Sequence, residues 1–233
     1  MASLVLIPGL LLTRQLYQHQ TPVLSEDFDL YHANTMGMNS ITLMAEDVLD
    51  STTGKIIPIG LSMGGYITLE IARLAPDRLA GMVVMDSAAS ADDADKIKQR
   101  KALIEMSKIG KFKGVTRTLL PSLIAPQHMQ DDALTSLIMA MAEEVGQENF
   151  THQQTAIMGR RDQFDTLRRL DLPSLFVVGE SDALTPPQKA QDMAKATQNS
   201  RYAEIANAGH LPPLEAPDAV TAVLVDFLNT LNL

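Results

Sequence analysis

The residues best placed for chemistry lie in the sequence Gly-Leu-Ser-Met-Gly at positions 60–64, where a single serine stands between two glycines. The residues before it, from Lys55, are mostly apolar and β-branched, which predicts a buried strand; the residues after it carry apolar side chains at helical spacing. A serine between such a strand and such a helix is typical of a nucleophile elbow. Gly60 and Gly64 lack the Cβ atoms that would collide in so tight a turn. We therefore expect the Oγ atom of Ser62 to stand clear of the backbone at the N-terminal end of a helix, where the helix dipole favours developing negative charge.

The motif alone also fits a flexible glycine–serine turn, so an acid and a histidine further along the chain decide between the two interpretations. Asp182 follows an apolar strand predicted at 173–178, and His210 follows a short strand predicted at 201–205. Each of them alone also fits a structural role. Together with Ser62 they stand at the C-terminal ends of strands, where sites form in open α/β sheets. A neutral imidazole can take the proton of a serine hydroxyl, and a carboxylate can hold the imidazole in the required tautomer. The pattern predicts Ser62 as nucleophile, His210 as base and Asp182 as acid.

A second carboxylate competes for the role of the acid. Asp86 ends the buried strand predicted at 79–85, so it also belongs to the C-terminal edge of the sheet. We favour Asp182 because the proline pair 186–187 fixes the chain behind it and starts a helix, whereas a flexible-looking serine–alanine stretch follows Asp86. If this choice is right, a carboxylate oxygen of Asp182 lies about 2.6–3.2 Å from Nδ1 of His210.

Regular alternation of strands and helices predicts the elements that position these groups. The fold class is α/β, with a mostly parallel sheet of about six strands and helices on both faces. The strands are expected at 3–7, 28–33, 55–60, 79–85, 173–178 and 201–205, and the mixed polarity of 28–33 suggests an edge strand. A helix is expected from about Thr13 to Gln20, and another from Ala216 to Leu231 closes the chain. Residues 1–90 and 172–233 would form this core.

Residues 91–171 contain no predicted strand and are expected to form a helical cap inserted between two strands of the sheet. Helices are expected from 92 to 108, 115 to 123, 131 to 145, 147 to 158 and 162 to 170. The segment 131–145 has the apolar spacing of an amphipathic helix. Methionines of the insertion could line an adaptable apolar pocket or pack helix against helix; they are Met106, Met129, Met139, Met141 and Met158. We expect Met141 and Met158 to influence the preferred chain length of a substrate.

Composition excludes several classes of protein. The 233 residues are 45% hydrophobic and 20% charged, typical of a globular chain, and the 28 acidic against 19 basic residues argue against nucleic acid as a partner. There is no cysteine, so disulfides and thiolate chemistry are excluded. The apolar stretch 4–12 has no preceding positive charge and is broken by Pro8, so we expect a strand there rather than a signal peptide, and a cytoplasmic protein. No run approaches a membrane span, and no motif predicts a metal or another cofactor.

The three motifs together resemble the α/β-hydrolase superfamily over essentially the whole chain. They are Gly60-Leu61-Ser62-Met63-Gly64-Gly65, Gly179-Glu180-Ser181-Asp182 and Gly209-His210, in the order nucleophile, acid, histidine that this superfamily uses. The chain looks most like small esterase-like members with a single cap. The resemblance implies that the backbone N–H groups of Leu10 and Met63 form an oxyanion hole. The chain departs from the family pattern in having Pro8-Gly9 where His-Gly is frequent, and in lacking the N-terminal β-hairpin, because the oxyanion strand starts at residue 3.

The resemblance implies a serine hydrolase that cleaves a small carboxylic ester through an acyl-enzyme intermediate. A thioesterase, a carbon–carbon bond hydrolase and a perhydrolase side activity of the same fold stay open, because fold alone does not select a reaction. A protein of another class, a ligand sensor that retains the triad without turnover, stays open as well. The expected partner is a small ester-like molecule, and the sequence leaves the oligomeric state open.

Overall fold

The computed structural model describes residues 2–109 and 112–231 and contains one six-stranded sheet in the order β2-β1-β3-β4-β5-β6. The strands are β1 (Ser3–Ile7), β2 (Leu30–His32), β3 (Ile56–Leu61), β4 (Met82–Met85), β5 (Ser174–Gly179) and β6 (Ser200–Ile205). Every pair of neighbours is parallel. The predicted α/β fold with six strands is therefore confirmed, and β2 lies at the edge of the sheet, as its mixed polarity indicated.

Side-chain alternation along the central strands divides the core into two layers. On β1, Leu4 and Leu6 belong to one cluster of buried apolar side chains, whereas Val5 and Ile7 belong to the other. Successive side chains of a strand point to opposite faces, so a continuous apolar run is what a strand covered on both faces requires. All six residues of β3 are buried in this way. The outer strand β6 is partly exposed and carries charged side chains.

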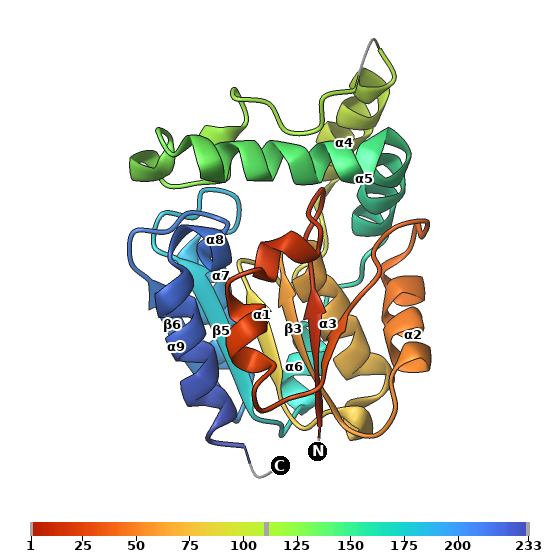
Figure 1. The fold of residues 1–233 in the computed structure, drawn as a ribbon. Helices are drawn as coiled ribbons and strands as arrows, with labels where there is room; N and C mark the ends of the chain where they lie inside the picture. Colours follow the sequence, from red (N-terminus) through yellow and green to blue (C-terminus); the bar gives the residue numbers. More distant parts are fainter. Residues whose placement is uncertain (1, 110–111, 232–233) are drawn as a thin grey trace.

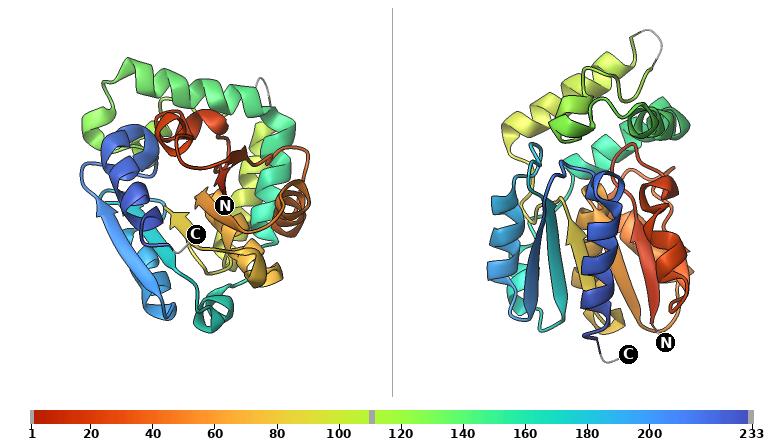
Figure 2. Two further views of the ribbon diagram at one scale, coloured as in Figure 1. Left: turned by 60° about the horizontal axis from the view of Figure 1, so that its bottom comes forward. Right: turned by 60° about the vertical axis from the view of Figure 1, so that its left-hand side comes forward.

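Helices cover both faces of the sheet (Figure 2). One face is covered by α1 (Gln20–Leu24) and α9 (Pro217–Leu228). The other is covered by α2 (Ile41–Ser51), α3 (Met63–Leu74), α6 (Phe164–Arg169) and α7 (Pro187–Ala196). Short elements complete the chain: α8 (Pro212–Glu215) and 3-10 turns at Arg14–Tyr17, Pro76–Arg78, Leu120–Ser122 and Pro126–His128.

Two longer helices, α4 (Ala94–Ser107) and α5 (Asp132–Met158), lie over one end of the sheet (Figure 1). Each starts at an aspartate whose side chain accepts a backbone N–H of the first turn, at 2.8 Å for Asp93 and 3.0 Å for Asp131. Gly146, with φ of +75°, interrupts α5 between the two helical segments that the sequence predicts separately. No strand occurs among the described residues of the insertion, but α6 at its end packs against α3 and α7 of the core.

Two local expectations are wrong, and one short helix was not expected. Within the helix expected over 115–123 the structure has only the 3-10 turn Leu120–Ser122, because Pro121 lacks the N–H that a helix interior needs. The helix expected over 13–20 is split into a 3-10 turn and α1. The short helix α8, directly after His210, was not expected, although Pro212 fits the first turn of a helix.

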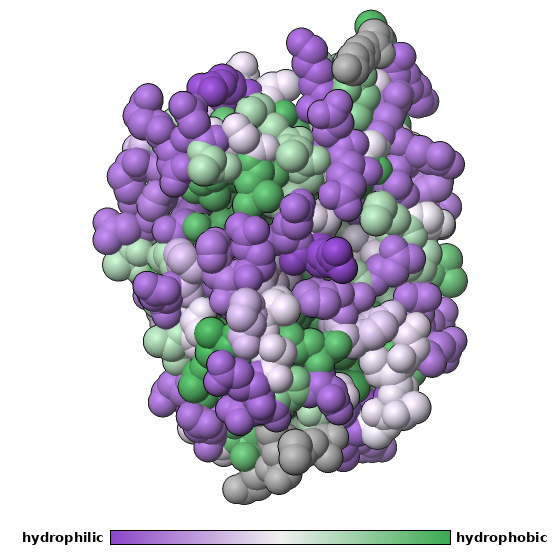
Figure 3. Space-filling model, in the orientation of Figure 1, coloured by the Kyte–Doolittle hydropathy of each residue, from purple (hydrophilic) through white to green (hydrophobic). Residues whose placement is uncertain are grey.

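Hydrophilic side chains cover most of the face in Figure 3, and hydrophobic side chains show between them both over the cap and lower down. None of the helices in the described part of the chain has the length and apolar character needed to cross a membrane.

Two glycines set the distance between the first helix after the serine and the sheet. A Cβ atom on Gly60 would lie 2.1 Å from the carbonyl oxygen of Gly64, and a Cβ on Gly64 would lie 2.1 Å from that of Ile7. These contacts are with backbone atoms, which cannot turn away as a flexible side chain does. The close approach of β1, β3 and α3 therefore requires glycine at both positions.

We expect Gly60→Ala to lower the free energy of unfolding by about 1–3 kcal/mol or more, because the added methyl overpacks this junction. Gly159→Ala is the control: its φ of −88° suits alanine and its nearest contacts would be at 3.7 Å. Denaturant unfolding of the two variants measures the difference. Equal stability of the two would contradict the close packing at the elbow.

Candidate active site

Ser62 occupies the turn between β3 and α3 with φ of +56° and ψ of −113°. A non-glycine residue in such a conformation is strained, by about 1–3 kcal/mol, and persists only where surrounding contacts hold it. Here the Ser62 N–H donates to the carbonyl of Met85 at 2.9 Å, and the Ser87 hydroxyl donates to the Ser62 carbonyl at 2.8 Å. Both partners belong to β4 or its end, so the neighbouring strand holds the turn in place.

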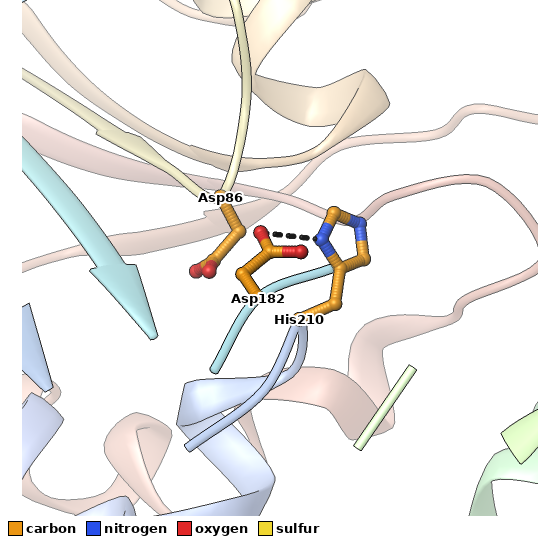
Figure 4. A group of neighbouring side chains, drawn as sticks. All are labelled: Asp86, Asp182 and His210. Atoms are coloured by element: carbon orange, nitrogen blue, oxygen red, sulfur yellow. Dashed lines mark hydrogen bonds and ion pairs between the residues drawn. The ribbon is translucent and has the colours of Figure 1, made fainter. Parts of the chain in front are cut away.

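His210 and Asp182 are in direct contact (Figure 4). Nδ1 of His210 lies 2.8 Å from Oδ2 of Asp182, which is the contact expected from the sequence. The Thr185 hydroxyl donates to the same oxygen at 2.6 Å, and the backbone N–H groups of Leu184 and Thr185 donate to Oδ1 at 2.8 and 3.0 Å. The carboxylate is thereby oriented by the turn that precedes α7.

Burial raises the pKa of Asp182, but the nearby imidazole and the hydrogen bonds from His210 and Thr185 outweigh it and hold the pKa below its ordinary value. Asp182 is therefore ionised at neutral pH. An ionised acceptor at Nδ1 favours the proton on that nitrogen and leaves Nε2 of His210 as the basic nitrogen.

Asp86, the competing carboxylate, lies on the far side of Asp182 from the imidazole (Figure 4). It is fully buried, its Oδ1 accepts the N–H of Gly179 at 2.8 Å, and its Oδ2 has no hydrogen-bond partner among the described residues. Burial and the charge of Asp182 raise the pKa of Asp86 well above its ordinary value. Its neutral form is favoured, and a neutral carboxyl group can donate toward Asp182.

Ligand atoms of Asp86, Asp182 and His210 lie within 4.8 Å of one another, a grouping that by distance alone would suit a metal ion. The donor chemistry fits an ion less well. Nδ1 of His210 and Oδ2 of Asp182 are bonded to each other, and Asp86 favours its neutral form. A metal ligand must be deprotonated and free to coordinate.

The loop after β1 lies close to the serine. A Cβ atom on Gly9 would be 3.1 Å from Cβ of Ser62. Neither the N–H of Leu10 nor that of Met63 has an acceptor within the part of the chain that the structure describes. The next N–H of the loop, at Leu11, donates to Oε1 of Gln153 on α5 at 3.0 Å. Two backbone donors beside Ser62 are therefore available to a ligand.

A cavity of about 640 Å³ opens between the insertion and the sheet with its loops, and both Ser62 and His210 line it. Other parts of its wall come from the loop after β1, from α4 and α5, and from the segment 112–123. Of the methionines singled out in the sequence, Met106 lines the cavity, whereas Met141 and Met158 do not. Met141 is fully buried in the apolar core cluster, which fits helix packing, and an influence of the two residues on chain length stays a prediction.

The sequence analysis missed two residues that hold the site together. Thr185 binds Asp182, as described above; a hydroxyl three residues after a predicted acid was the available signal. Buried Glu215 accepts N–H groups from Gly209 and Leu211, on either side of His210, and from Ala125 of the insertion at 2.7 Å. Burial raises the pKa of Glu215 despite these three donors. Nothing in the sequence distinguishes Glu215 from a surface carboxylate.

The sequence and the fold match a known group of enzymes. Residues 4–223 match the alpha/beta hydrolase family, and the chain belongs to it. It is a hydrolase of the esterase-like kind. A thermophilic esterase from Thermogutta terrifontis, solved with malate bound, superimposes with a TM-score of 0.91 at 28% identity, over 98% of this chain and 90% of the other.

Two esterases are also similar to this chain in sequence. Esterase YbfF of Escherichia coli is 25% identical over 195 residues, which are 80% of this chain and 74% of the relative. The pimeloyl-acyl-carrier-protein methyl ester esterase of Neisseria meningitidis is 25% identical over 174 residues, covering 73% of this chain and 68% of the relative.

The raised pKa of Asp86 leads to a pH-dependent effect on stability. A carboxyl whose folded-state pKa is raised stabilises the fold below its ordinary pKa, and this contribution is lost as the pH rises toward the raised value. Asp86→Asn keeps the acceptor for Gly179 but cannot ionise. We expect the variant to gain stability relative to the wild type as the pH rises from about 4 to about 8. Urea unfolding at several pH values measures this, with exposed Asp50→Asn as control. If the difference in the free energy of unfolding between variant and wild type stays constant across this pH range, the pKa of Asp86 is the same in the folded and unfolded states.

Proposed function

We propose that this protein is a serine esterase whose catalytic triad is Ser62, His210 and Asp182. The observation that carries the proposal is the 2.8 Å contact between His210 Nδ1 and Asp182, combined with the opening of Ser62 and His210 into one cavity. The match to the alpha/beta hydrolase family, and relatives that are themselves esterases, support it.

In the first half of the reaction, Nε2 of His210 takes the proton of Ser62 Oγ as this oxygen attacks the ester carbonyl carbon. The carbonyl oxygen becomes an oxyanion and accepts the free N–H groups of Leu10 and Met63. Collapse of this tetrahedral intermediate breaks the bond to the alcohol oxygen, which receives the proton from His210. The alcohol leaves, and the acyl group stays on Ser62.

In the second half, His210 takes a proton from water, and the hydroxide oxygen attacks the acyl carbon. The second oxyanion uses the same two N–H donors, and its collapse returns the proton from His210 to Ser62 Oγ and releases the acid. Asp182 stays ionised throughout and stabilises the imidazolium that forms in each half. Asp86 lies on the side of Asp182 away from the imidazole (Figure 4).

The cap supplies the substrate pocket and no member of the triad. The proposed cap comprises α4, the segment that follows it and α5; α6, near the end of the insertion expected over 91–171, packs against α3 and α7. The substrate is a small ester. A thioesterase or a carbon–carbon bond hydrolase would share this triad, so an activity screen with methyl esters, thioesters and β-diketones separates these reactions.

We expect Ser62→Ala to lower kcat for ester hydrolysis by about five to six orders of magnitude, because removal of a triad nucleophile disables the unit. Exposed Ser181→Ala, close to the acid but with its side chain free of hydrogen bonds to described residues, is the control and should stay within about twofold of the wild type. Turnover of a 4-nitrophenyl ester measures both. A Ser62→Ala variant with a tenth of the wild-type rate would rule out the assignment, and a rapid burst without turnover in the wild type would favour a ligand sensor.

The same assay should distinguish the roles of Asp182 and Asp86. We expect Asp182→Asn to lower kcat about 10⁴-fold, because an amide does not stabilise the imidazolium or fix the tautomer as a carboxylate does. We expect Asp86→Asn to cost less than about tenfold, since an amide can still accept from Gly179 and donate to Asp182. The opposite ranking would make Asp86 the acid.

A further inference from the structure

The wall of the cavity has a charge opposite to that of the rest of the chain. Five cationic side chains and one carboxylate line it: Lys96, Arg100, Lys113, Arg160 and Lys189, with Asp92 as the carboxylate. The whole chain has 19 basic and 28 acidic residues and a net charge of −9. Positive charge concentrated in a cleft of an acidic protein raises the local concentration of anions, so it points to an anionic ligand.

One of the two arginines is fully used inside the protein. Arg160 donates to the carbonyl of Ser90 through Nε and Nη2 and to that of Ile157 through Nη1. Its Nη2 also lies 2.9 Å from Oδ1 of Asp92, and its guanidinium stacks 4.2 Å from the ring centre of Tyr66. Arg160 therefore supports the wall and has little left to offer a ligand.

The other arginine keeps a free donor group. Nε of Arg100 donates to Oδ2 of Asp92 at 2.6 Å, and Nη1 donates to Oε1 of Gln154 at 2.7 Å. Nη2 has no acceptor within residues 2–109 and 112–231, and the side chain is 21% exposed. Two fixed contacts orient the guanidinium before a ligand arrives, so little side-chain entropy remains to be lost on binding.

The buried carboxylate between the arginines does not cancel their charge. The side chain of Asp92 is 1% exposed and is shared by Arg100 and Arg160, so the trio keeps one net positive charge. Burial raises the pKa of Asp92, but hydrogen bonds and charges of Arg160 and Arg100 lower it further, so it is ionised. The net charge of +1 and the free Nη2 group of Arg100 are suited to binding one carboxylate.

An apolar stretch lies beside this charged group on the same helix. Lys96, Arg100 and Leu103 follow one another at helical spacing on the face of α4 that lines the cavity, and Met106 continues the apolar part. Phe150 and Ile138 of α5 line it as well. A ligand of this cavity thus meets apolar side chains and one fixed cation within the same space.

We propose that the cavity takes esters that carry a second, ionised carboxylate, such as monoesters of linear dicarboxylic acids, and that Arg100 binds this carboxylate. The proposal rests on the esterase function proposed above. The ester carbonyl lies at Ser62, the methylene chain lies along the apolar side chains, and the free carboxylate accepts Nη2 of Arg100. Lys96, Lys113 and Lys189, which are exposed and line the cavity, attract the anion from solution.

The test compares monomethyl with dimethyl esters of linear dicarboxylic acids of about four to ten carbons, with release of methanol as the readout. These pairs share chain length and scissile bond and differ in one charge. We expect kcat/KM to be at least about tenfold higher for the monoester at the best chain length, the size of a hydrogen bond between charged groups. Methyl 6-aminohexanoate, which carries the opposite charge, should be the poorest substrate.

Two variants test whether Arg100 causes the preference for monoesters. Arg100→Gln should bring monoester and diester to within about twofold of each other while hydrolysis of the diester continues. Lys98→Gln is the matched control, because Lys98 is an exposed cation of the same helix that does not line the cavity; it should leave the ratio unchanged. If Arg100→Gln does not fold, raising NaCl from about 20 to about 500 mM with the wild type takes its place, and the monoester preference should shrink as charge is screened.

The possible results distinguish failure of the carboxylate site from failure of the proposed esterase function. Hydrolysis of diesters and monoesters at equal rates at low salt overturns the carboxylate site and leaves the esterase intact. Labelling of Ser62 by a fluorophosphonate without hydrolysis of any ester in the series also overturns it. If Ser62 is not labelled and no ester is hydrolysed, the proposed function itself fails.

Discussion

The close crossing of α3 over β1 and β3 is the constraint on which the site depends. It exists because Gly60 and Gly64 have no Cβ, and backbone oxygens occupy the space where one would stand. The crossing forces Ser62 into a left-handed conformation at the start of α3, and β4 holds it there through the Met85 carbonyl and the Ser87 hydroxyl. The strain at one residue is thus balanced by the packing of three strands and a helix.

The remaining groups of the site are positioned by buried carboxyl groups with different tasks. Asp182 is kept ionised by His210 and Thr185, whereas Asp86 favours its neutral form because it is fully buried and lies beside the charge of Asp182. Glu215 accepts hydrogen bonds from Gly209, beside His210, and from Ala125 of the insertion, and so links the two segments. Burial alone raises the pKa of all three, and the local donors and charges decide which of them stays charged.

Much of this could be predicted from the sequence because the information is local. The elbow, the six strands and the position of Asp182 depend on short patterns of glycine, β-branched residues and proline, and the structure agrees with each of them. The contact of His210 with Asp182 rather than Asp86 could also be predicted, because Pro186 and Pro187 mark a rigid turn after Asp182.

Long-range contacts could not be predicted in the same way. The role of Glu215 depends on Ala125, 90 positions away, and that of Gln153 depends on Leu11, 142 positions away. The helix expected over 115–123 is absent because Pro121 interrupts it despite the apolar pattern. The sequence could not show that Met141 lies outside the cavity. Helical spacing identifies the buried face of a helix, but it does not tell which neighbouring part of the protein that face packs against.

The most direct test of the account is to trap the covalent intermediate. Trypsin cleavage after Lys55 and Arg73 releases a peptide, 56–73, in which Ser62 is the only serine. Enzyme quenched in acid during turnover of a methyl ester and analysed by mass spectrometry should carry the acyl mass on this peptide, at Ser62. Turnover that continues with no acyl mass on the peptide, or with the mass on another residue, would contradict the assignment of Ser62 as the nucleophile.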